Sequence, residues 1–582
     1  MLHRDRTEEM LPGKIGPSTE IVIFFIFLLD ILMYIYINIV YMQQKDLKLQ
    51  RKRLSALPVI QETIDHIGLG DLLVQFVGNK RYASALLVTL KNILLERGAL
   101  YRVQDWAKEF EPAFIDEHTL NDDVIGRALD KLYESDRASM QTKCVLATIK
   151  KCGLSTDVIH NDTTSVSVSG RYESQDKGAI QLKRGHSKDH RPDLKQLVYG
   201  LSVTEDGALP VHFKTYDGNQ TDDTTHQETW LTLRGLLGRS DFTYVADSKL
   251  CTEENLKFID RNQGRFITVV PKTRLETKDF SKEAYHSQVR WENLWRRRIS
   301  RKNDKYDQFE VAQGFYQMRE GYAMYWYRSS EKMKRDIAER ESKIAAAQDK
   351  LIALMSTKRR GPKTAKALMT AADKILAKTK TSEWINVIIE QKDEVIYRKS
   401  SRGKPGKDAI YRRIDRKIPK LVYTLNRDAI AKSKSMDGIF PLTTNAKLTA
   451  LEALKHYKYQ PKLEKRFTFL KSVTCVAPIF LKNNRRIEAL MFVYFLALLV
   501  SAVIERKLKL AMVDKRVESL PTLPEGRLSK NPTWEQILRL FEHHYRHELY
   551  DGKAAIKTFS DPLSPTQSQV LNLLKIPAMA YG

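Results

Sequence analysis

Three acidic residues in this sequence have the types and positions that metal-dependent phosphoryl transfer requires. Asp162 follows β-forming residues in DVIHNDTTS, Asp247 follows the run TYVA, and Glu464 lies in an expected helix. An acid just past a strand can point from the end of a sheet toward a shared site, and hard divalent cations prefer carboxylate oxygens. Two such ions, about 3.5–4 Å apart, activate a nucleophile and stabilise the leaving oxygen of a phosphodiester. A single Asp in such a place is ordinarily a turn or cap residue, so the prediction depends on the set.

The elements that must position these acids begin near Ser155, where short apolar runs start to alternate with turns. The stretches DVIHNDTTSVSV, QLVYGLSVTEDGALPVHFKTY and TYVADS predict strands, and the middle one predicts a hairpin across residues 205–207. A helix is expected over 252–261, and RFITVVPK predicts a further strand. This succession resembles the start of an RNase H-like mixed sheet flanked by helices, so the expected fold class is α/β.

The segments outside this sheet differ in pattern. Upstream, apolar residues recur at three and four, which predicts a helical domain, and Asn121 is expected to cap one of its helices. The changes of pattern divide the chain into an apolar extension (1–42), a helical domain that we expect to bind DNA ends (43–151), the first part of the sheet domain (152–272), a basic insertion (273–436), the second part of the sheet domain (437–512) and a helical tail (513–582).

Positive charge runs through the whole chain. Lys and Arg number 97 against 71 Asp and Glu, a net charge of +26. Such a field concentrates a polyanion at the surface, so DNA is the expected partner, although an anionic membrane or a basic protein without such a partner also fits the charge alone. The four cysteines include no C-x-x-C pair, which indicates neither a zinc ribbon nor a disulfide framework and fits a reducing cytoplasm.

The helix that carries Glu464 holds a spaced set of polar residues. Tyr457, Gln460, Glu464 and Lys471 are separated by two, three and six residues. At 3.6 residues per turn, Gln460 and Lys471 should project from the same face as Glu464. We expect Tyr457, Gln460 and Lys471 to lie at the DNA beside the carboxylates, with Lys471 touching a phosphate near the cut.

With these residues the sequence resembles bacterial DDE-class insertion-sequence transposases of the IS-four type. It resembles the branch whose first acid lies in a D-T-T-S stretch and whose helix carries Tyr, Arg, Glu and Lys at this spacing; Gln460 stands where Arg is commonest. Stretches 185–197, 245–250 and 437–445 look like the same branch. A four-position signature joined to two suitably placed acids is far more specific than a lone motif.

The resemblance implies an RNase H-like (retroviral-integrase-like) fold and a cut-and-paste transposase that cleaves the ends of an insertion sequence and joins them to target DNA. It implies that Asp162, Asp247 and Glu464 hold two Mg²⁺ or Mn²⁺ ions, with Asp162 shared between them, and that no small-molecule cofactor is needed. The implied partners are the terminal inverted repeats, target DNA and a second copy of the chain, since two ends are handled together. The expected location is the cytoplasm, at the nucleoid.

The stretch between the second and third acids is too long for a simple connection and is strongly basic. It contains strand-like stretches around YAMYWYRS and KLVYTL and a helical run at 331–355, where Ile337, Ile344 and Leu351 keep a heptad spacing. This short heptad predicts a helical hairpin that packs on itself rather than a dimerising coiled coil. In similar transposases, a domain inserted here packs over the active site and holds the transposon end.

Two basic clusters are candidates for DNA contact. Trp291 and Trp295 fit stacking on an extruded base, and Arg296, Arg297 and Arg298 fit phosphate contacts. The alternative is that the tryptophans are core residues on one helical face, at i and i+4. A second cluster, which fits phosphate contact or plain surface solvation, consists of Lys188, His190, Arg191 and Lys195.

The apolar segment 21–42 is long enough to cross a bilayer, with Asp30 and Asn38 in its middle. A carboxylate there is costly in a membrane, so two interpretations remain: a membrane anchor, or translation that begins at Met42. We favour the second, because everything after Met42 looks like a soluble DNA enzyme. Near the other end, the apolar stretch 489–504 is too short for a span and predicts a buried core helix.

The tail contains His543, His544 and His547, three histidines within five residues. They could bind a metal, but we expect a solvated helical face. Three functions are therefore weighed. A transposase comes first, followed by an RNase H-like nuclease or an inactive transposase-derived DNA-binding protein, and then by a membrane-anchored nucleic-acid-binding protein built on 21–42.

Overall fold

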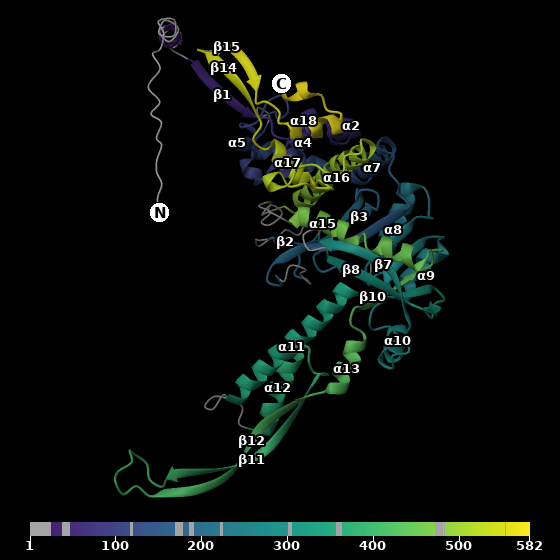
Figure 1. The fold of residues 1–582 in the computed structure, drawn as a ribbon, viewed down its shortest axis with the longest axis vertical. Helices are drawn as coiled ribbons and strands as arrows, with labels where there is room; N and C mark the ends of the chain where they lie inside the picture. Colours follow the sequence, from purple (N-terminus) through teal and green to yellow (C-terminus); the bar gives the residue numbers. More distant parts are fainter. Residues whose placement is uncertain are drawn as a thin grey trace, which may run out of the picture. The chain divides into compact units, whose positions relative to one another are not determined.

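The computed structural model describes residues 25–37, 47–116, 120–168, 178–185, 191–220, 225–300, 305–356, 364–471, 481, 483–552 and 554–582. It divides into two compact units, one combining Met1–Ser135 with Val500–Gly582 and the other comprising Asp136–Leu499. Figure 1 shows both units and labels their elements.

A ten-stranded mixed sheet forms the centre of the second unit. Its strand order is β4-β3-β2-β5-β6-β13-β10-β8-β7, with β9 paired to β10. The strands are β2 (Val158–Val168), β3 (Lys195–Thr204), β4 (Pro210–Tyr216), β5 (Thr243–Ala246), β6 (Arg265–Val269), β7 (Trp291–Ser300), β8 (Lys305–Ala312), β9 (Tyr316–Gln317), β10 (Ala323–Ser329) and β13 (Ile439–Thr444).

The first five strands have the arrangement that the alternating apolar runs predicted. β2, β3 and β4 form an antiparallel meander, and β5 and β6 follow on the other side of β2 in parallel with it. The hairpin between β3 and β4 confirms the turn expected at 205–207, where Gly207 adopts a φ of 82° that favours glycine. Helix α8 (His226–Leu237) precedes β5, and α9 (Glu253–Arg261), capped by Thr252, precedes β6.

Strand β13 confirms the prediction that the chain returns to the sheet near 437–445. It pairs with β6 on one side and with β10 on the other. Strands β10, β8 and β7 therefore extend the same sheet, and only the remainder of segment 273–436 stands apart from it. The physical reason is a shared core, whose buried side chains are Val245, Ile267, Phe309, Tyr327, Phe440, Leu442 and Leu454.

The rest of the basic segment forms a helical hairpin and a β-ribbon (Figure 1). Its elements after α10 (Leu275–Tyr285) are α11 (Ser330–Ser356), α12 (Ala365–Thr379), β11 (Ile385–Lys399), β12 (Tyr411–Leu425) and α13 (Arg427–Ser435). Leu351 of α11 packs against Leu368, Ala372 and Leu376 of α12. The predicted helical hairpin is thus confirmed.

Helices α14 (Ala450–Tyr457) and α15 (Gln460–Lys471) replace the single helix expected through Glu464. Pro461 is the second residue of α15, where its missing N–H costs no helical bond. Helix α16 (Asn484–Asp514) is, in the described part of the chain, the one helix long and apolar enough to cross a membrane. Its most apolar window is 94% buried in the structure, which confirms the predicted core helix.

The other unit combines helices with a small sheet. The helices of this first unit are α2 (Leu57–Ile67), α3 (Leu69–Val77), α4 (Lys80–Leu95), α5 (Val103–Ala107), α6 (Asp122–Glu134), α17 (Trp534–Phe541) and α18 (Pro565–Leu574). The next helix along the chain, α7 (Arg137–Cys152), belongs to the second unit. Asn121 caps α6 as predicted, its side chain accepting the Val124 N–H at 2.8 Å. Within 21–42, Phe25–Ile37 is helical with exposed apolar side chains, and the remainder lies outside the described residues.

The tail is not entirely helical, which corrects the prediction for 513–582. Strand β1 (Leu47–Arg53) pairs with β14 (Tyr545–Asp551), and β14 pairs with β15 (Ala554–Ser560). His544 is buried against Tyr581, and His547 lies on β14 at 2.8 Å from Asp561, so the solvated helical face expected for the histidines is wrong. Asp551 and Gly552, a pair typical of tight hairpin turns, are the signal for this hairpin.

Candidate active site

Asp162 and Asp247 lie on neighbouring strands of the central sheet. β2 and β5 run in parallel, and their register pairs His160 with Val245. Each acid follows two residues later, and side chains alternate across a strand, so both carboxylates lie on the face that carries His160 and Val245. Because neighbouring strands are about 4.8 Å apart, the fold brings the first two predicted acids side by side where β5 ends.

Local hydrogen bonds hold both half-buried acids in place. The Oδ1 atom of Asp247 accepts the Lys249 backbone N–H at 3.0 Å, and its carbonyl oxygen accepts the Thr268 hydroxyl at 2.6 Å. These bonds fix the turn that follows β5. The Oδ1 atom of Asp162 accepts the Thr163 backbone N–H at 2.7 Å.

The third acid comes from the helices that cover this face. Tyr457, the last residue of α14, packs against the core cluster of the sheet. The pKa of Tyr457 is raised to about 12, first by burial and then by the charges of Asp247, Glu464 and Asp162. All three acids therefore act on one hydroxyl group, which remains protonated at neutral pH and keeps its hydrogen for donation.

The chemistry of these acids suits a hard divalent cation, since carboxylate oxygens are the ligands that Mg²⁺ prefers. Their spacing is looser than a closed site requires. Within the described residues, no group of three or more His, Cys, Asp or Glu side chains is placed to hold a metal ion. Asp162 and Asp247 are neighbours, whereas Glu464 is exposed on α15, so Glu464 would have to approach the strand pair.

Gln460 points into the protein. It is only 8% exposed, its Oε1 lies 3.0 Å from Nδ1 of His160, and its Nε2 donates to the Asn161 carbonyl at 3.3 Å. The expected projection beside Glu464 toward DNA is therefore wrong. The reason is that α15 begins at Gln460, so this side chain belongs to the first turn, which packs on β2.

We expect Gln460→Arg to destabilise the protein by about 1–3 kcal/mol and not to tighten DNA binding. The substitution removes a buried hydrogen bond and places a guanidinium beside a neutral imidazole. Denaturant unfolding of the full chain measures the loss, and Lys465→Arg, on an exposed position of the same helix, is the matched control. If the Gln460→Arg protein has unchanged stability and higher DNA affinity, Gln460 faces DNA after all.

His160 was not among the predicted site residues. Burial lowers its pKa to about 4, against the opposing effect of the hydrogen bond to Gln460, so the ring is neutral at physiological pH. Its ring centre lies 5.2 Å from that of Tyr459. Its place two residues before Asp162, on the same face of a predicted strand, is the sequence signal that identifies it as a neighbour of the acids.

Lys458 is a second neighbour that the sequence did not reveal. Its Nζ lies 4.6 Å from the ring centre of Phe440 and 4.9 Å from that of Phe309. Burial lowers the pKa of Lys458 to about 8, Asp307 opposes the shift and Arg297 adds to it. The charges of Arg335 and Lys332 act on Lys458 in the same direction as that of Arg297.

The tryptophans and arginines of 291–298 lie on strand β7, which pairs with β8, so the alternative of a helical face is wrong. Trp295 stacks on Phe309 with ring centres 5.4 Å apart, and the Arg328 guanidinium lies 4.6 Å from the ring centre of Trp291. Arg296 lies over the ring of Tyr306 at 3.9 Å. Both indole rings are engaged within the protein, and their stacking on a base stays a prediction, as do the phosphate contacts of Arg296, Arg297 and Arg298.

Of the second basic cluster, the structure describes Arg191 and Lys195. Lys188 and His190 lie outside the described residues. The exposed Arg191 forms a two-pronged ion pair with Asp193, at 2.8 and 2.9 Å, and Lys195 begins β3. Lys471 ends α15, two turns beyond Glu464, and its phosphate contact stays a prediction.

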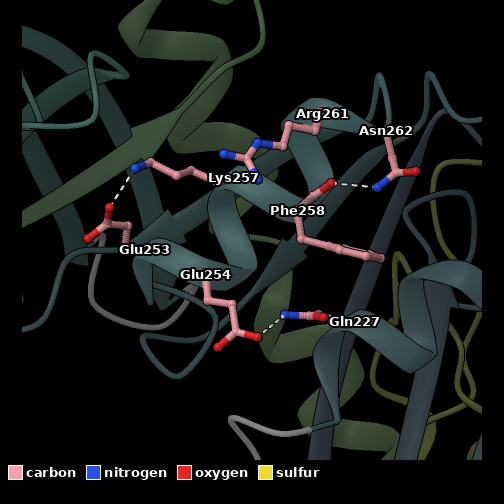
Figure 2. Close-up of a pocket in the computed structure, with 7 residues that line it drawn as sticks. All are labelled: Gln227, Glu253, Glu254, Lys257, Phe258, Arg261 and Asn262. Atoms are coloured by element: carbon pink, nitrogen blue, oxygen red, sulfur yellow. Dashed lines mark hydrogen bonds and ion pairs between the residues drawn. The ribbon is translucent and has the colours of Figure 1, made fainter.

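A cavity of about 420 Å³ lies apart from these residues, on helices α8 and α9 (Figure 2). Its polar side chains pair with one another: Gln227 donates to Glu254 at 3.3 Å, and Lys257 pairs with Glu253. None of the predicted acids lines it. The candidate active site is therefore the sheet face beneath α14 and α15 rather than this cavity.

Comparisons with known proteins add little to this geometry. No protein-family model and no curated protein matches the chain. Six chains of known structure match, among them the piggyBac transposase synaptic complex with hairpin DNA, at 11% identity and a TM-score of 0.25. That match covers 43% of this chain and 52% of that chain, about half its length, and a likeness at this TM-score supports no argument about activity.

Proposed function

We propose that this protein is a DNA transposase of the DDE class, which cuts the ends of an insertion sequence and joins them to target DNA. The observation that carries the proposal is the placement of Asp162 and Asp247 on neighbouring parallel strands, on the sheet face that the helix carrying Glu464 packs against. The electrostatic influence of all three acids on Tyr457 is consistent with it. Asp162 and Asp247 lie far apart in the sequence, and a shared catalytic site is a reason for such acids to be neighbours in the fold.

The strand order also supports the proposal, because it is the order expected at the start of an RNase H-like sheet. The meander β2-β3-β4 is followed by β5, which pairs with β2 in parallel, and by β6, which pairs with β5 in parallel, and a helix precedes each of them. On such a sheet the first acid is expected on the first strand, the second on a later adjacent strand and the third on a following helix. Asp162 on β2, Asp247 after β5 and Glu464 on α15 follow that order.

The side chains of the site would divide the work by their chemistry. Asp162 and Asp247, joined by Glu464, would hold two Mg²⁺ or Mn²⁺ ions, which supply an activated nucleophile and a stabilised leaving oxygen. The neutral Tyr457 would donate its O–H to a phosphate or carboxylate oxygen beside them. Lys458 and Arg297 would offer positive charge to the DNA backbone.

DNA as the substrate is supported by the net charge of +26. The proposed partners are the terminal inverted repeats, the target DNA and a second copy of the chain. Contacts with phosphates release counterions, so this proposal also requires binding that weakens steeply as salt is raised.

A cleavage and strand-transfer assay tests the proposed function. Purified full-length protein is incubated with labelled DNA that carries the sequences flanking its gene, a target plasmid and Mg²⁺, and with EDTA as the control. We expect a cut at a defined end and joining of that end to the plasmid, both abolished by EDTA. Cutting without joining would favour the RNase H-like nuclease, and binding without either reaction would favour an inactive transposase-derived protein.

A further inference from the structure

Strands β11 and β12 form an isolated two-stranded ribbon. They pair from Ile385 and Leu425 at the base to Lys399 and Tyr411 near the tip. The base packs on the α11–α12 hairpin, where Ile385 and Leu421 are buried. Residues 391–419, here called the arm, contain no buried residue and extend beyond the helices (Figure 1).

The arm exposes apolar and aromatic side chains that its own fold leaves uncovered. Val395 is 45% exposed, Tyr397 66%, Ile410 75% and Tyr411 50%. An isolated two-stranded hairpin is at best marginally stable in water, because it has no second layer to bury these groups. The arm therefore has the properties of an element completed by a partner.

The charge of the arm indicates which partner. Between 398 and 413 seven residues are basic and one, Asp408, is acidic. Arg398 lies directly opposite Arg412 in the register, and like charges in that position destabilise a strand pair. Arg413 bonds to Asp415, and Arg416 to Glu394. Among the described residues, the arm's other eight basic side chains form no ion pair: Lys392, Arg398, Lys399, Arg402, Lys404, Lys407, Arg412 and Lys417.

We propose that the arm binds duplex DNA by lying in the major groove. A groove about 12 Å wide admits a two-stranded ribbon. The nine residues of β11 within the arm span about 30 Å at about 3.4 Å per residue, close to one turn of DNA. Phosphates on either side of the groove would offset the repulsion between Arg398 and Arg412. The side chains of Tyr397, Ile410 and Tyr411 would contact sugars and base edges.

A second copy of the chain is the competing occupant. Every copy carries a net charge of +26, so another copy repels the strongly basic arm, whereas a polyanion attracts it. The proposal rests on DNA being the substrate of this protein, but its test does not require cleavage.

Binding of a mixed-sequence 30-base-pair duplex, followed by fluorescence anisotropy over a range of salt concentrations, tests the proposal. The arm variant carries Gln in place of Arg398, Arg402, Lys404 and Arg412. The control variant carries Gln in place of Lys350, Lys366, Lys374 and Lys378, four exposed lysines on α11 and α12. All eight positions are exposed, so thermal unfolding of both proteins should match that of the wild type.

We expect the arm variant to bind about 100-fold more weakly at moderate salt, with the slope of log affinity against log salt smaller by about three to four units. The control variant should change the slope by less than about one unit. On a duplex whose major groove is filled by glucosylated cytosines, the arm variant and the wild type should bind alike. Saturating the minor groove with netropsin should leave their difference intact.

An arm variant with the wild-type slope would overturn the proposal, and so would a loss no larger than that of the control variant. A change of mass without DNA, from dimer to monomer, would assign the arm to a second copy of the chain instead. The result of this test can be told apart from failure of the proposed function. If the protein cuts and joins DNA but the arm variant binds like the wild type, only the proposal for the arm is refuted. If the protein binds DNA through the arm but never cuts it, only the transposase function is refuted.

Discussion

Asp162→Asn and Asp247→Asn are each expected to reduce DNA cleavage by about 1000-fold or more while leaving DNA affinity within about twofold. Asn keeps the shape of the side chain and can still accept the local backbone hydrogen bonds. What it lacks is the negative charge that a divalent cation needs from its ligand. The chemistry should therefore fail while the phosphate contacts elsewhere on the protein persist.

The assay is single-turnover cleavage of a labelled element end in Mg²⁺, with binding of the same DNA measured in Ca²⁺. Asp241→Asn is the matched control, because Asp241 is an exposed acid just before β5, at the opposite end of the strand from Asp247. It should cut at the wild-type rate. Near-normal cleavage by either strand variant would remove that acid from the site.

The Glu464→Gln variant tests whether Glu464 is the third metal ligand. If α15 approaches the strand pair when DNA is bound, this variant should lose as much activity as the strand variants. If Glu464→Gln keeps its activity while the strand variants lose theirs, the third ligand lies elsewhere. That outcome would also explain why the described residues contain no group of three acids placed to hold a metal ion.

The sheet and its two strand acids were predictable because their signals are local. Asp162 and Asp247 each follow residues of high β propensity, and sequence alternation alone places an acid on a face once its strand is known. The turn at 205–207 and the cap at Thr252 mark element ends in the same direct way. Local rules therefore predicted the strands that carry Asp162 on β2 and Asp247 just after β5, whose role as metal ligands stays a prediction.

The predictions that were wrong concern residues whose positions depend on contacts between distant segments of the chain. Trp291 and Trp295 have a helical spacing, yet β7 becomes a strand because β8 offers an edge with which it pairs. Gln460 has the spacing of a helix face, but the break before α15 turns it toward His160, which lies 300 residues away in the sequence. No single-sequence pattern carries either contact.

A buried ion pair joins the basic segment to the sheet. Arg340 of α11 donates to both carboxylate oxygens of Asp437, at 2.6 and 2.5 Å, and Asp437 stands just before β13. The two residues are 3% and 7% exposed. The stretch 437–445, which returns the chain to the sheet, thus begins with a residue that holds the long helix of the basic segment.

Arg340→Met is expected to destabilise the second unit by about 3–5 kcal/mol, because it leaves the charge of Asp437 buried without a partner. The double variant with Asp437→Leu should regain most of that loss, since replacing both partners by apolar groups is often neutral. The chain has two units and need not unfold in one step, so hydrogen exchange resolved to α11 and β13 is the measurement.

Lys343→Met is the control for this experiment, because Lys343 is one turn along the same helix and pairs with the exposed Glu339. A surface pair of that kind contributes less than about 1 kcal/mol. If the double variant is no more stable than Arg340→Met, the lost stability comes from packing of the arginine stem and not from the unpaired charge. If both are as stable as wild type, the ion pair does not anchor α11, and the base of the arm is held by the α11–α12 core alone.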